Sequence, residues 1–259
     1  MRAHAGPRGT WVIDLDGVVW LAEQPIAGSA DAVARLRQAG HGVVFATNNA
    51  SPTVAELRQR LARAGIEASS EEIVTSAQAA ASMLAPGSTA VVCGDGGVLE
   101  ALAERGISVL PEGPADAVVV GWTRRFDFDL LSTAATAVRL GARFIGTNED
   151  PTHPTPKRLL PGSGAILAAV ATAAQATPEV AGKPHEPMAA LLRSRAAAAA
   201  VVVGDRPSTD GALARRLGLL FALVRTGVTS DGREPMVVEP DEEAPDLETL
   251  VARHLDTNG

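Results

Sequence analysis

The chain alternates short apolar runs with longer stretches rich in alanine and leucine, and this alternation limits its fold more than any other feature. The pattern is typical of parallel strands joined by crossover helices, so the sequence predicts an α/β protein. The apolar runs predict strands at 11–13, 42–46, 91–93, 117–120, 143–146, 200–203 and 219–224. The amphipathic stretches predict helices at 30–38, 52–64, 97–104, 129–140, 165–176, 186–194 and 209–217, with a closing helix from Asp246.

The composition narrows the partners and the location that we expect. A net charge of -7 offers no basic surface for a nucleic acid or an anionic membrane. The single cysteine, Cys93, cannot form an internal disulfide, and the first apolar run is reached without the features of a secretory signal. The longest apolar stretches, 165–174 and 196–203, are shorter than the ~20 residues of a spanning helix. We therefore expect a cytoplasmic protein that binds neither nucleic acid nor membrane.

Two aspartates follow the first predicted strand. Asp14 and Asp16 are two residues apart, so along an extended chain their side chains share a direction while Leu15 points away. Open parallel sheets bind ligands at the carboxyl ends of their strands, which is where this pair falls. An Asx turn closed by Gly17 explains the same pattern equally well.

Polar groups also follow the second predicted strand, and a lysine stands in a constrained position later in the chain. Thr47 and Asn48 end the run 43–46 and offer a hydroxyl and an amide to a phosphoryl oxygen, although an ordinary turn or helix cap is the alternative. Lys183 stands between a glycine and a proline. Lysine occurs only at Lys157 and Lys183, and 21 of the 23 basic residues are arginine, which suggests that Lys183 needs a compact charge. A surface position is the alternative.

A second pair of aspartates follows the strand predicted at 200–203. Asp205 ends that run and Asp210 stands at the start of the next helix, where a turn former and a first-turn acid are the ordinary explanations. Four aspartates at one sheet edge repel each other by about 4 kcal/mol per pair at ~4 Å and an effective dielectric of ~20. A divalent cation would relieve this, and oxygen ligands favour Mg²⁺ over zinc.

These segments, taken in order, resemble the motifs of the haloacid dehalogenase superfamily: Asp14-Leu15-Asp16-Gly17, Thr47-Asn48, Lys183, and Gly204-Asp205 with Asp210. Residues 141–148 and 161–164 are similar to the nitrophenylphosphatase-like branch, which includes phosphatases for phosphoglycolate, glycerol 3-phosphate, pyridoxal phosphate and nucleotides. The resemblance implies a Rossmann-like parallel-sheet core at 1–78 and 182–259. An inserted α/β cap of the large type would occupy 79–181.

The resemblance also implies a role for each of these residues. Asp14 would be the nucleophile, and Asp16 would protonate the leaving alkoxide and then activate water. The residues that would bind substrate or phosphate are Thr47, Asn48 and Lys183. Mg²⁺ would be bound by Asp14, the backbone carbonyl of Asp16, Asp205 and, through water, Asp210.

The reaction that we expect is Mg²⁺-dependent hydrolysis of a small phosphorylated metabolite through a phospho-aspartate. Asp16 favours a phosphatase, because a dehalogenase needs no acid at that position. Glycerol 3-phosphate and phosphoglycolate are the favoured substrates, with p-nitrophenyl phosphate as an artificial one. The alternatives are a phosphatase for sugar, nucleotide or pyridoxal phosphates, a phosphotransferase, and a catalytically silent sensor of a phosphorylated metabolite. Caps of this type often pair, so a homodimer is open.

Several other segments carry weaker expectations. The proline-rich segment 147–161 predicts a rigid loop, and the segment 94–97 predicts a strand-to-helix turn of the cap, not a dinucleotide site. Gly211 is expected to weaken the turn that holds it, and the acidic residues 241–243 to form solvated surface. A few cap residues could meet the substrate, although most will be plain surface: Arg124, Arg125, His153, Lys157 and Arg158.

Overall fold

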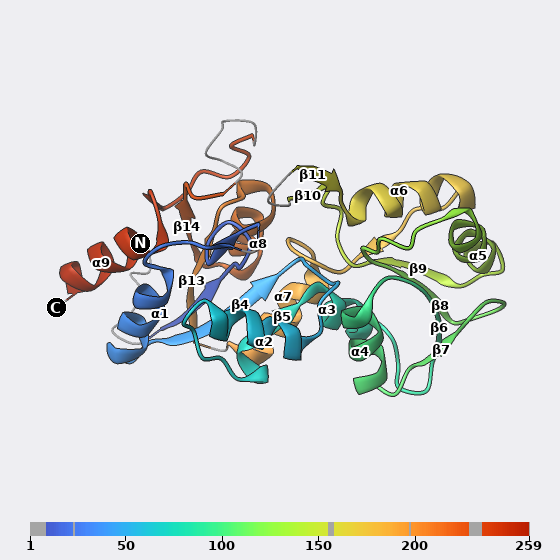
Figure 1. Ribbon diagram of the computed structural model, residues 1–259, viewed down its shortest axis with the longest axis horizontal. Helices are drawn as coiled ribbons and strands as arrows, with labels where there is room; N and C mark the ends of the chain where they lie inside the picture. The colour runs from blue at the N-terminus through green and yellow to red at the C-terminus, as the bar shows by residue number, and fades with distance from the viewer. Residues whose placement is uncertain (1–8, 23, 155–157, 197, 228–234, 259) are drawn as a thin grey trace. The chain divides into compact units, whose positions relative to one another are not determined.

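The computed structural model describes residues 9–22, 24–154, 158–196, 198–227 and 235–258 (Figure 1). The chain divides into two compact units, and each is described by itself. The first unit is formed by Met1–Thr47, Arg58–Val74 and Ala189–Gly259. The second unit is formed by Asn48–Leu57 and Thr75–Met188. The domain boundaries at 1–78, 79–181 and 182–259 stay a prediction.

The first unit is built on a six-stranded sheet. Its strands are β1 (Thr10–Ile13), β4 (Gly42–Thr47), β5 (Ile73–Thr75), β13 (Ala199–Gly204), β14 (Leu220–Val224) and β15 (Glu242–Ala244), in the spatial order β15-β14-β13-β1-β4-β5. Strand β1 lies at the centre and pairs in parallel with β13 and β4. Its residues Val12 and Ile13 are completely buried, as expected for a parallel strand that is covered on both faces.

Helices surround this sheet. They are α1 (Ser29–Gln38), α2 (Val54–Arg63), α7 (Glu186–Arg195), α8 (Ala212–Leu217) and α9 (Leu247–Asn258), and α2 and α7 begin in segments of the second unit. Helices α1 and α9 contact each other along the sheet (Figure 1). The predicted parallel α/β core is therefore confirmed.

The second unit has its own five-stranded parallel sheet. Its strands are β6 (Thr89–Cys93), β7 (Ser108–Leu110), β8 (Ala117–Val120), β9 (Arg143–Gly146) and β12 (Glu179–Val180), in the order β12-β9-β8-β6-β7. Its helices are α3 (Ser76–Ser82), α4 (Gly96–Glu104), α5 (Phe128–Arg139) and α6 (Ser163–Ala174). Helices α5 and α6 cover one face of the sheet and α4 lies on the other (Figure 1).

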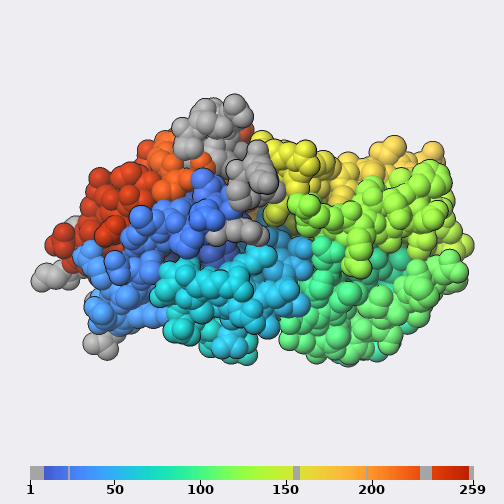
Figure 2. Space-filling view, viewed as in Figure 1, coloured from blue at the N-terminus to red at the C-terminus, as the bar shows by residue number. Residues whose placement is uncertain are grey.

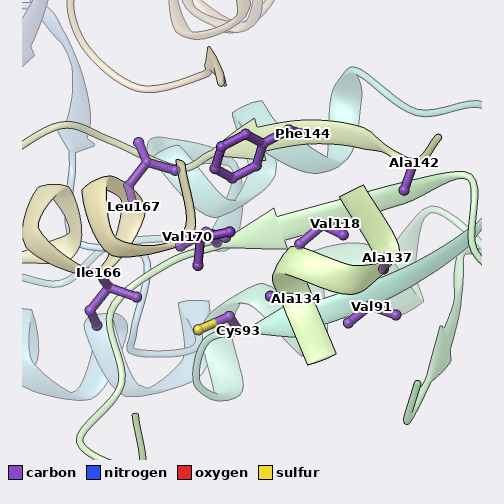
Figure 3. Close-up of a cluster of buried hydrophobic side chains, with 11 residues drawn as sticks. Val91, Cys93, Val118, Ala134, Ala137, Ala142, Phe144, Ile166, Leu167 and Val170 are labelled. Carbon is purple, nitrogen blue, oxygen red and sulfur yellow. The ribbon is translucent and has the colours of Figure 1, made fainter. Parts of the chain in front are cut away.

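Alanines let a helix approach this second sheet closely. Ala134 and Ala137 of α5 are buried in one cluster with strand residues such as Val118, and Phe144 of β9 and Leu167 of α6 belong to the same cluster (Figure 3). Small and large side chains are thus buried together, and the apolar surface that they remove from water stabilises this unit. The alanine-rich composition is explained by this close packing.

Several short elements differ from the sequence-based expectations. The segment 147–161, predicted as a loop, contains an antiparallel pair of strands, β10 (Thr152–Pro154) and β11 (Leu159–Pro161). The start of the helix predicted at 209–217 is a π-helical turn, η2 (Pro207–Gly211), before α8. A side chain at Gly211 would meet the ring of Phe221 within 2.9 Å, so the glycine predicted to weaken this turn is needed for its packing.

The acidic segment predicted as solvated surface also takes part in the fold. Glu242 and Glu243 are exposed but belong to the edge strand β15. Asp241 accepts hydrogen bonds from the backbone N–H of Phe221 at 2.9 Å and from Arg215 at 2.6 Å. The prediction was wrong for Asp241, because this carboxylate joins the edge strand to its neighbours. The described helices include none that combines the length and the apolarity needed to cross a membrane.

Candidate active site

The first unit brings two of the predicted aspartates to the carboxyl ends of adjacent strands. Strands β1 and β13 pair in register with Ile13 opposite Val203, so the residues that follow them come together. The backbone N–H of Asp14 continues the ladder by donating to the carbonyl of Val203 at 2.9 Å. Asp14 is 7% exposed and Asp205 is 4% exposed. Each carboxylate is therefore held by a rigid strand end and is largely removed from water.

A third aspartate returns to the same place because of the π-helical turn η2. Within this turn the backbone N–H of Asp210 donates to the carbonyl of Arg206 at 2.8 Å, and the N–H of Arg206 donates to Asp210 Oδ2 at 3.2 Å. The carboxylate lies so close to Gly204 that any side chain there would overlap it. Asp210 is 1% exposed. The turn thus folds Asp210 back over the end of β13.

Asp14, Asp205 and Asp210 form a cluster in which one oxygen from each lies within 4.8 Å of the other two. In the described part of the chain, this is the only group of three or more acidic, histidine or cysteine side chains that meets this condition. At this separation and an effective dielectric of about 20, each pair of carboxylates repels by about 3 kcal/mol. Three buried carboxylates fit a hard divalent cation such as Mg²⁺, which prefers oxygen ligands.

Gly17 allows the loop after β1 to close over this cluster. Its φ of 89° lies in the left-handed region that favours glycine. A side chain at this position would also come within 2.5 Å of Asp205 Oδ2. The hydroxyl of Thr226, which follows β14, donates to the Gly17 carbonyl and fixes the loop from the other side. The Asx-turn alternative for this motif is therefore compatible with a functional one, since the turn itself shapes the cluster.

Asp16 belongs to the same loop but has different partners. Its side chain is partly exposed. Asp16 Oδ1 accepts a hydrogen bond from the indole N–H of Trp20 at 3.0 Å, and Oδ2 lies 3.5 Å from the hydroxyl of Thr47. Thr47 ends β4, which pairs with β1 so that Phe45 lies opposite Ile13. The sheet register therefore explains why Thr47 reaches Asp16.

In the second unit, Asn48 holds the backbone of Lys183. Asn48 Oδ1 accepts from the N–H of Lys183 at 2.8 Å, and its Nδ2 donates to the Lys183 carbonyl at 3.3 Å and to Asp150 Oδ2 at 3.2 Å. A side chain at Gly182 would come within 2.5 Å of Asn48 Oδ1, so the glycine is required for this approach. Lys183 is 4% exposed, which rules out the surface alternative.

The backbone of Asn48 is fixed by two residues that sequence reasoning missed. The hydroxyl of Ser76 and the amide of Asn148 each donate to the Asn48 carbonyl at 2.6 Å. These contacts join residues 28 and 100 positions apart, and no local pattern in the sequence signals them. The predicted role of Asn48 in contacting substrate stays a prediction, while its contacts make it a support for Lys183.

The candidate substrate residues of the second unit have distinct surroundings. The guanidinium of Arg124 lies 5.8 Å from the ring centroid of Trp122, and the ring of His153 lies 4.8 Å from the same indole. Arg125 reaches Asp95 at 3.5 Å, and Arg158 is exposed. Lys157 lies outside the described residues. The structure therefore brings Arg124 and His153 together on Trp122, a residue that the sequence pattern did not single out.

The predicted strand-to-helix turn at residues 94–97 is confirmed. It joins β6 to α4, and the N–H of Gly97 donates to the carbonyl of Ser51 at 2.8 Å. Asp95 stands at the N-cap position of α4, and its carboxylate accepts from the hydroxyl of Ser51 at 3.0 Å. This turn packs against the chain itself, which agrees with the structural role expected for it.

Comparison with protein-family models finds two matches along the chain. Residues 11–108 match a model described as haloacid dehalogenase-like hydrolase. Residues 180–250 match a model of HAD hydrolase-like proteins. The first match contains Asp14, Asp16 and Thr47, and the second contains Lys183 and both aspartates of the second pair.

Two similar proteins and one solved structure place this match more finely. D-glycerol 3-phosphate phosphatase of Mycobacterium tuberculosis is 38% identical over 241 residues, which are 89% of this chain and 66% of the relative. This chain thus spans slightly less than two thirds of that relative. Acid sugar phosphatase of Staphylococcus haemolyticus is 34% identical over 85% of this chain and 86% of its own length. The crystal structure of the glycerol phosphate phosphatase of M. tuberculosis in complex with magnesium superposes with a TM-score of 0.87 at 36% identity, and covers 95% of this chain and 77% of that one.

Proposed function

The chain belongs to the haloacid dehalogenase-like hydrolase family, and on this basis we propose that it is a Mg²⁺-dependent phosphatase that acts through a phospho-aspartate on Asp14. The observation that carries the proposal is the cluster of Asp14, Asp205 and Asp210, whose carboxylate oxygens lie within 4.8 Å of each other. Both relatives reported above are named as phosphatases, which supports the same reaction class.

The residues of the cluster fit a bound Mg²⁺. Asp14, Asp205 and Asp210, together with the backbone carbonyl of Asp16, would hold the ion, Asp210 through water. When bound, Mg²⁺ supplies a positive charge that offsets the repulsion among the carboxylates and the charge of the phosphoryl group. The crystal structure of the glycerol phosphate phosphatase of M. tuberculosis in complex with magnesium supports this choice of ion.

Asp14 is the nucleophile in this proposal. One of its carboxylate oxygens forms a bond to phosphorus while the bond from phosphorus to the ester oxygen of the substrate breaks. The strand end holds Asp14 in a fixed position, so little orientational freedom is lost when the substrate binds. Water then attacks the acyl phosphate, and Asp14 is released together with inorganic phosphate.

Asp16 moves the proton in both steps. In the first step it gives its proton to the leaving alkoxide, and in the second step it takes a proton from the attacking water. Its partial exposure suits a group that must reach both substrate and water. From the family resemblance we carry over Thr47 and Lys183 as ligands of the transferring phosphoryl oxygens. The contacts of Asn48 then contribute by fixing the Lys183 backbone.

The substrate that we propose is a small phosphorylated metabolite, with glycerol 3-phosphate favoured and phosphoglycolate next. The name of the relative from M. tuberculosis supports the first choice. A sugar phosphate is the second candidate, because the relative from S. haemolyticus is named acid sugar phosphatase. Arg124 and His153, which lie together on Trp122, are the side chains that we propose to contact the part of the substrate beyond its phosphate.

The test is phosphate release from glycerol 3-phosphate, phosphoglycolate, a hexose phosphate, pyridoxal phosphate and p-nitrophenyl phosphate, measured with Mg²⁺ or with EDTA. We expect turnover that needs Mg²⁺ and that disappears in Asp14→Asn. Tight binding of a phosphate ester without turnover of any compound would contradict the proposal and favour a sensor. Transfer to added glycerol or ethanol in preference to water would favour a phosphotransferase.

A further inference from the structure

Trp20 lies against Asp16 because the chain after β1 turns back on itself. The N–H groups of Val19 and Trp20 both donate to the carbonyl of Leu15, at 2.9 and 3.1 Å. The N–H of Gly17 in turn donates to the carbonyl of Trp20 at 2.7 Å. Trp20 then begins the short hairpin of β2 (Trp20–Leu21) and β3 (Gln24–Pro25). This local fold is fixed by backbone hydrogen bonds, so the position of the indole follows from it.

The two oxygens of Asp16 are held unequally. Oδ1 accepts the indole N–H of Trp20 at 3.0 Å, which is an ordinary hydrogen-bond length. Oδ2 lies 3.5 Å from the hydroxyl of Thr47, at the outer limit of such a bond. In the described part of the chain, these are the two side chains that contact the Asp16 carboxyl group by hydrogen bonding. The indole therefore holds Oδ1 in place, while Oδ2 is the oxygen that can take part in proton transfer.

We infer that Trp20 is a positioning residue for Asp16, and that it selects Oδ2 as the oxygen that carries the transferred proton. The inference rests on the proposed function, in which Asp16 is the general acid and base. An indole N–H can only donate, and in a neutral carboxyl group the carbonyl oxygen accepts a hydrogen bond better than the hydroxyl oxygen does. When Asp16 is protonated, its hydrogen is then on Oδ2 and its orientation about the Cβ–Cγ bond is fixed.

The indole N–H of Trp20 stays bonded to Oδ1 of Asp16 in this proposal, while the proton leaves Oδ2 in the first step and returns to it in the second. In the first step the proton leaves Oδ2 for the oxygen of the departing alcohol, and Asp16 becomes a carboxylate. The hydrogen bond from Trp20 becomes stronger at this point, because a charged acceptor binds a donor more tightly than a neutral one. It therefore contributes more in the transition state than in the ground state, which is the condition for accelerating the step. In the second step Oδ2 takes a proton from water.

The surroundings of Trp20 differ from those of the other indole in the same unit. Trp20 is 4% exposed, yet it lines a hollow of about 310 Å³ between its hairpin and the end of α2 that holds Arg60 and Arg63 (Figure 2, blue and cyan). Trp11, in the core of the same unit, offers a contrast. Its indole N–H is buried and has no hydrogen-bond partner among the described residues. The fold thus tolerates an indole without a partner at one position and directs another onto the proposed acid.

The experiment compares leaving groups on one molecular frame. Aryl phosphates from p-nitrophenyl phosphate to phenyl phosphate and p-methoxyphenyl phosphate differ mainly in how much the leaving oxygen needs a proton. kcat/KM is measured with Mg²⁺ for wild type, Trp20→Phe, Asp16→Asn and the double variant. It reports the step in which the ester bond breaks, so later release of phosphate does not mask the effect.

We expect the poorest leaving groups to suffer most. Trp20→Phe should lower kcat/KM by about 10- to 100-fold for p-methoxyphenyl phosphate, and by less than about 3-fold for p-nitrophenyl phosphate. Asp16→Asn should show the same trend with a larger slope. Adding Trp20→Phe to Asp16→Asn should change little further, because both substitutions remove one function.

Trp11→Phe is the matched control, since it makes the same change in the same unit without removing a hydrogen bond. It should leave the dependence on the leaving group unchanged, even if it lowers stability. If Trp20→Phe does not fold, benzothienylalanine at position 20 keeps the shape of the indole and replaces N–H by sulfur. The same loss is expected for that variant.

Three contrary results are distinguishable. If Asp16→Asn steepens the dependence on the leaving group and neither change at position 20 does, Trp20 is not a positioning residue and the inference fails. If Asp16→Asn itself shows no such dependence, the acid role of Asp16 fails, and with it this part of the proposed function. A uniform loss for all aryl phosphates in Trp20→Phe would also overturn the inference, because it would indicate a general structural effect.

Discussion

The two units share an architecture and differ in what stands at the ends of their strands. In the first unit β1 and β13 end in Asp14 and Asp205, whose carboxylates face each other and Asp210. In the second unit β6 is followed by Asp95, which stands before a helix and has the hydroxyl of Ser51 and the guanidinium of Arg125 as partners. A parallel sheet therefore does not determine chemistry by itself. Three carboxylates within 4.8 Å of each other favour a bound cation, while the hydroxyl and guanidinium partners of Asp95 indicate a structural role.

The largest expected effect is the gain in stability on adding Mg²⁺, which should depend on the carboxylates of the first unit and not on those of the second. At a concentration of about 100 times its Kd, a ligand stabilises the folded state by about 2.7 kcal/mol. We expect wild type to gain stability of this size over the EDTA-treated protein, measured as a shift in Tm. Asp205→Asn should lose most of the shift and most of the activity.

Asp95→Asn is the control for this prediction, because it makes the same change outside the cluster and the amide oxygen can still accept from the hydroxyl of Ser51. It should keep the full Mg²⁺-dependent shift in Tm. If Asp205→Asn kept the shift as well, or if Asp95→Asn lost it, the distinction between the two sets of carboxylates would be broken.

Two glycines with similar backbone angles sharpen the comparison. Gly17 has φ 89° and faces Asp205, whereas Gly87 has φ 84° and a Cβ added there would meet no atom within 4 Å. Gly87→Ala should cost about 1 kcal/mol of backbone strain. Gly17→Ala should cost about 1–3 kcal/mol and also lower kcat, because the side chain displaces Asp205.

Denaturant unfolding and phosphatase assays of the two variants provide the measurement. Equal losses of stability with unchanged kcat in both would mean that the close approach of Gly17 to Asp205 has no consequence. That result would count against the proposed arrangement of the loop.

A smaller effect is expected at Cys93, which is the last residue of β6 in the second unit. Burial raises the pKa of the Cys93 thiol to about 12, and the nearby charges of Asp95 and Asp127 act in the same direction. The thiol therefore stays protonated in the folded protein, while in the unfolded chain it ionises near its ordinary value. Its contribution to stability is present at neutral pH and is lost as the pH rises from that ordinary value toward 12.

Reaction with a disulfide reagent measures this directly. Native protein at about pH 8, close to the ordinary thiol pKa, should react at the rate of global or local unfolding, and denaturant should release the single thiol of the chain. Fast reaction of the native protein would show that β6 does not bury its terminal residue.

The smallest effect concerns His254 on α9. Its ring packs edge-on against Trp11 and His41, at 5.0 and 5.8 Å between centroids. Burial lowers the pKa of His254, the charge of Glu242 opposes this, and His41 adds to the lowering. The unfolded chain therefore takes up the proton first, so this contribution is present above the ordinary histidine pKa and is lost as the pH falls through the lowered value. His254→Gln should flatten the fall in Tm between about pH 7 and pH 5, relative to wild type.

The sequence predicted the sheets better than it predicted the contacts of the site. The strands Ala117–Val120 and Arg143–Gly146 agree with the predicted ranges, because each holds adjacent β-branched or aromatic residues between turn-forming segments. Short elements such as Ile73–Thr75 and Ser76–Ser82 were missed, since a run of three residues or a short alanine-rich segment carries no clear periodicity.

The aspartate cluster was predicted in outline because the carboxyl ends of parallel strands must share an edge. The contact of Asn48 with Lys183 spans 135 residues, and it depends on packing that no local pattern encodes. Trp20 was missed for another reason. Its place on Asp16 depends on the turn at residues 15–20, and a tryptophan after a glycine turn gives no signal of that geometry.

The central claim is that phosphate passes through Asp14, and trapping the intermediate tests it most directly. Enzyme with Mg²⁺ and glycerol 3-phosphate, or the best substrate of the panel, is quenched in acid during turnover. It is then reduced with borohydride, which converts an acyl phosphate to an alcohol, and its peptides are sequenced by mass spectrometry. We predict homoserine at position 14 in wild type and none in Asp14→Asn. Turnover with an unmodified position 14, or reduction at another carboxylate, would contradict the claim.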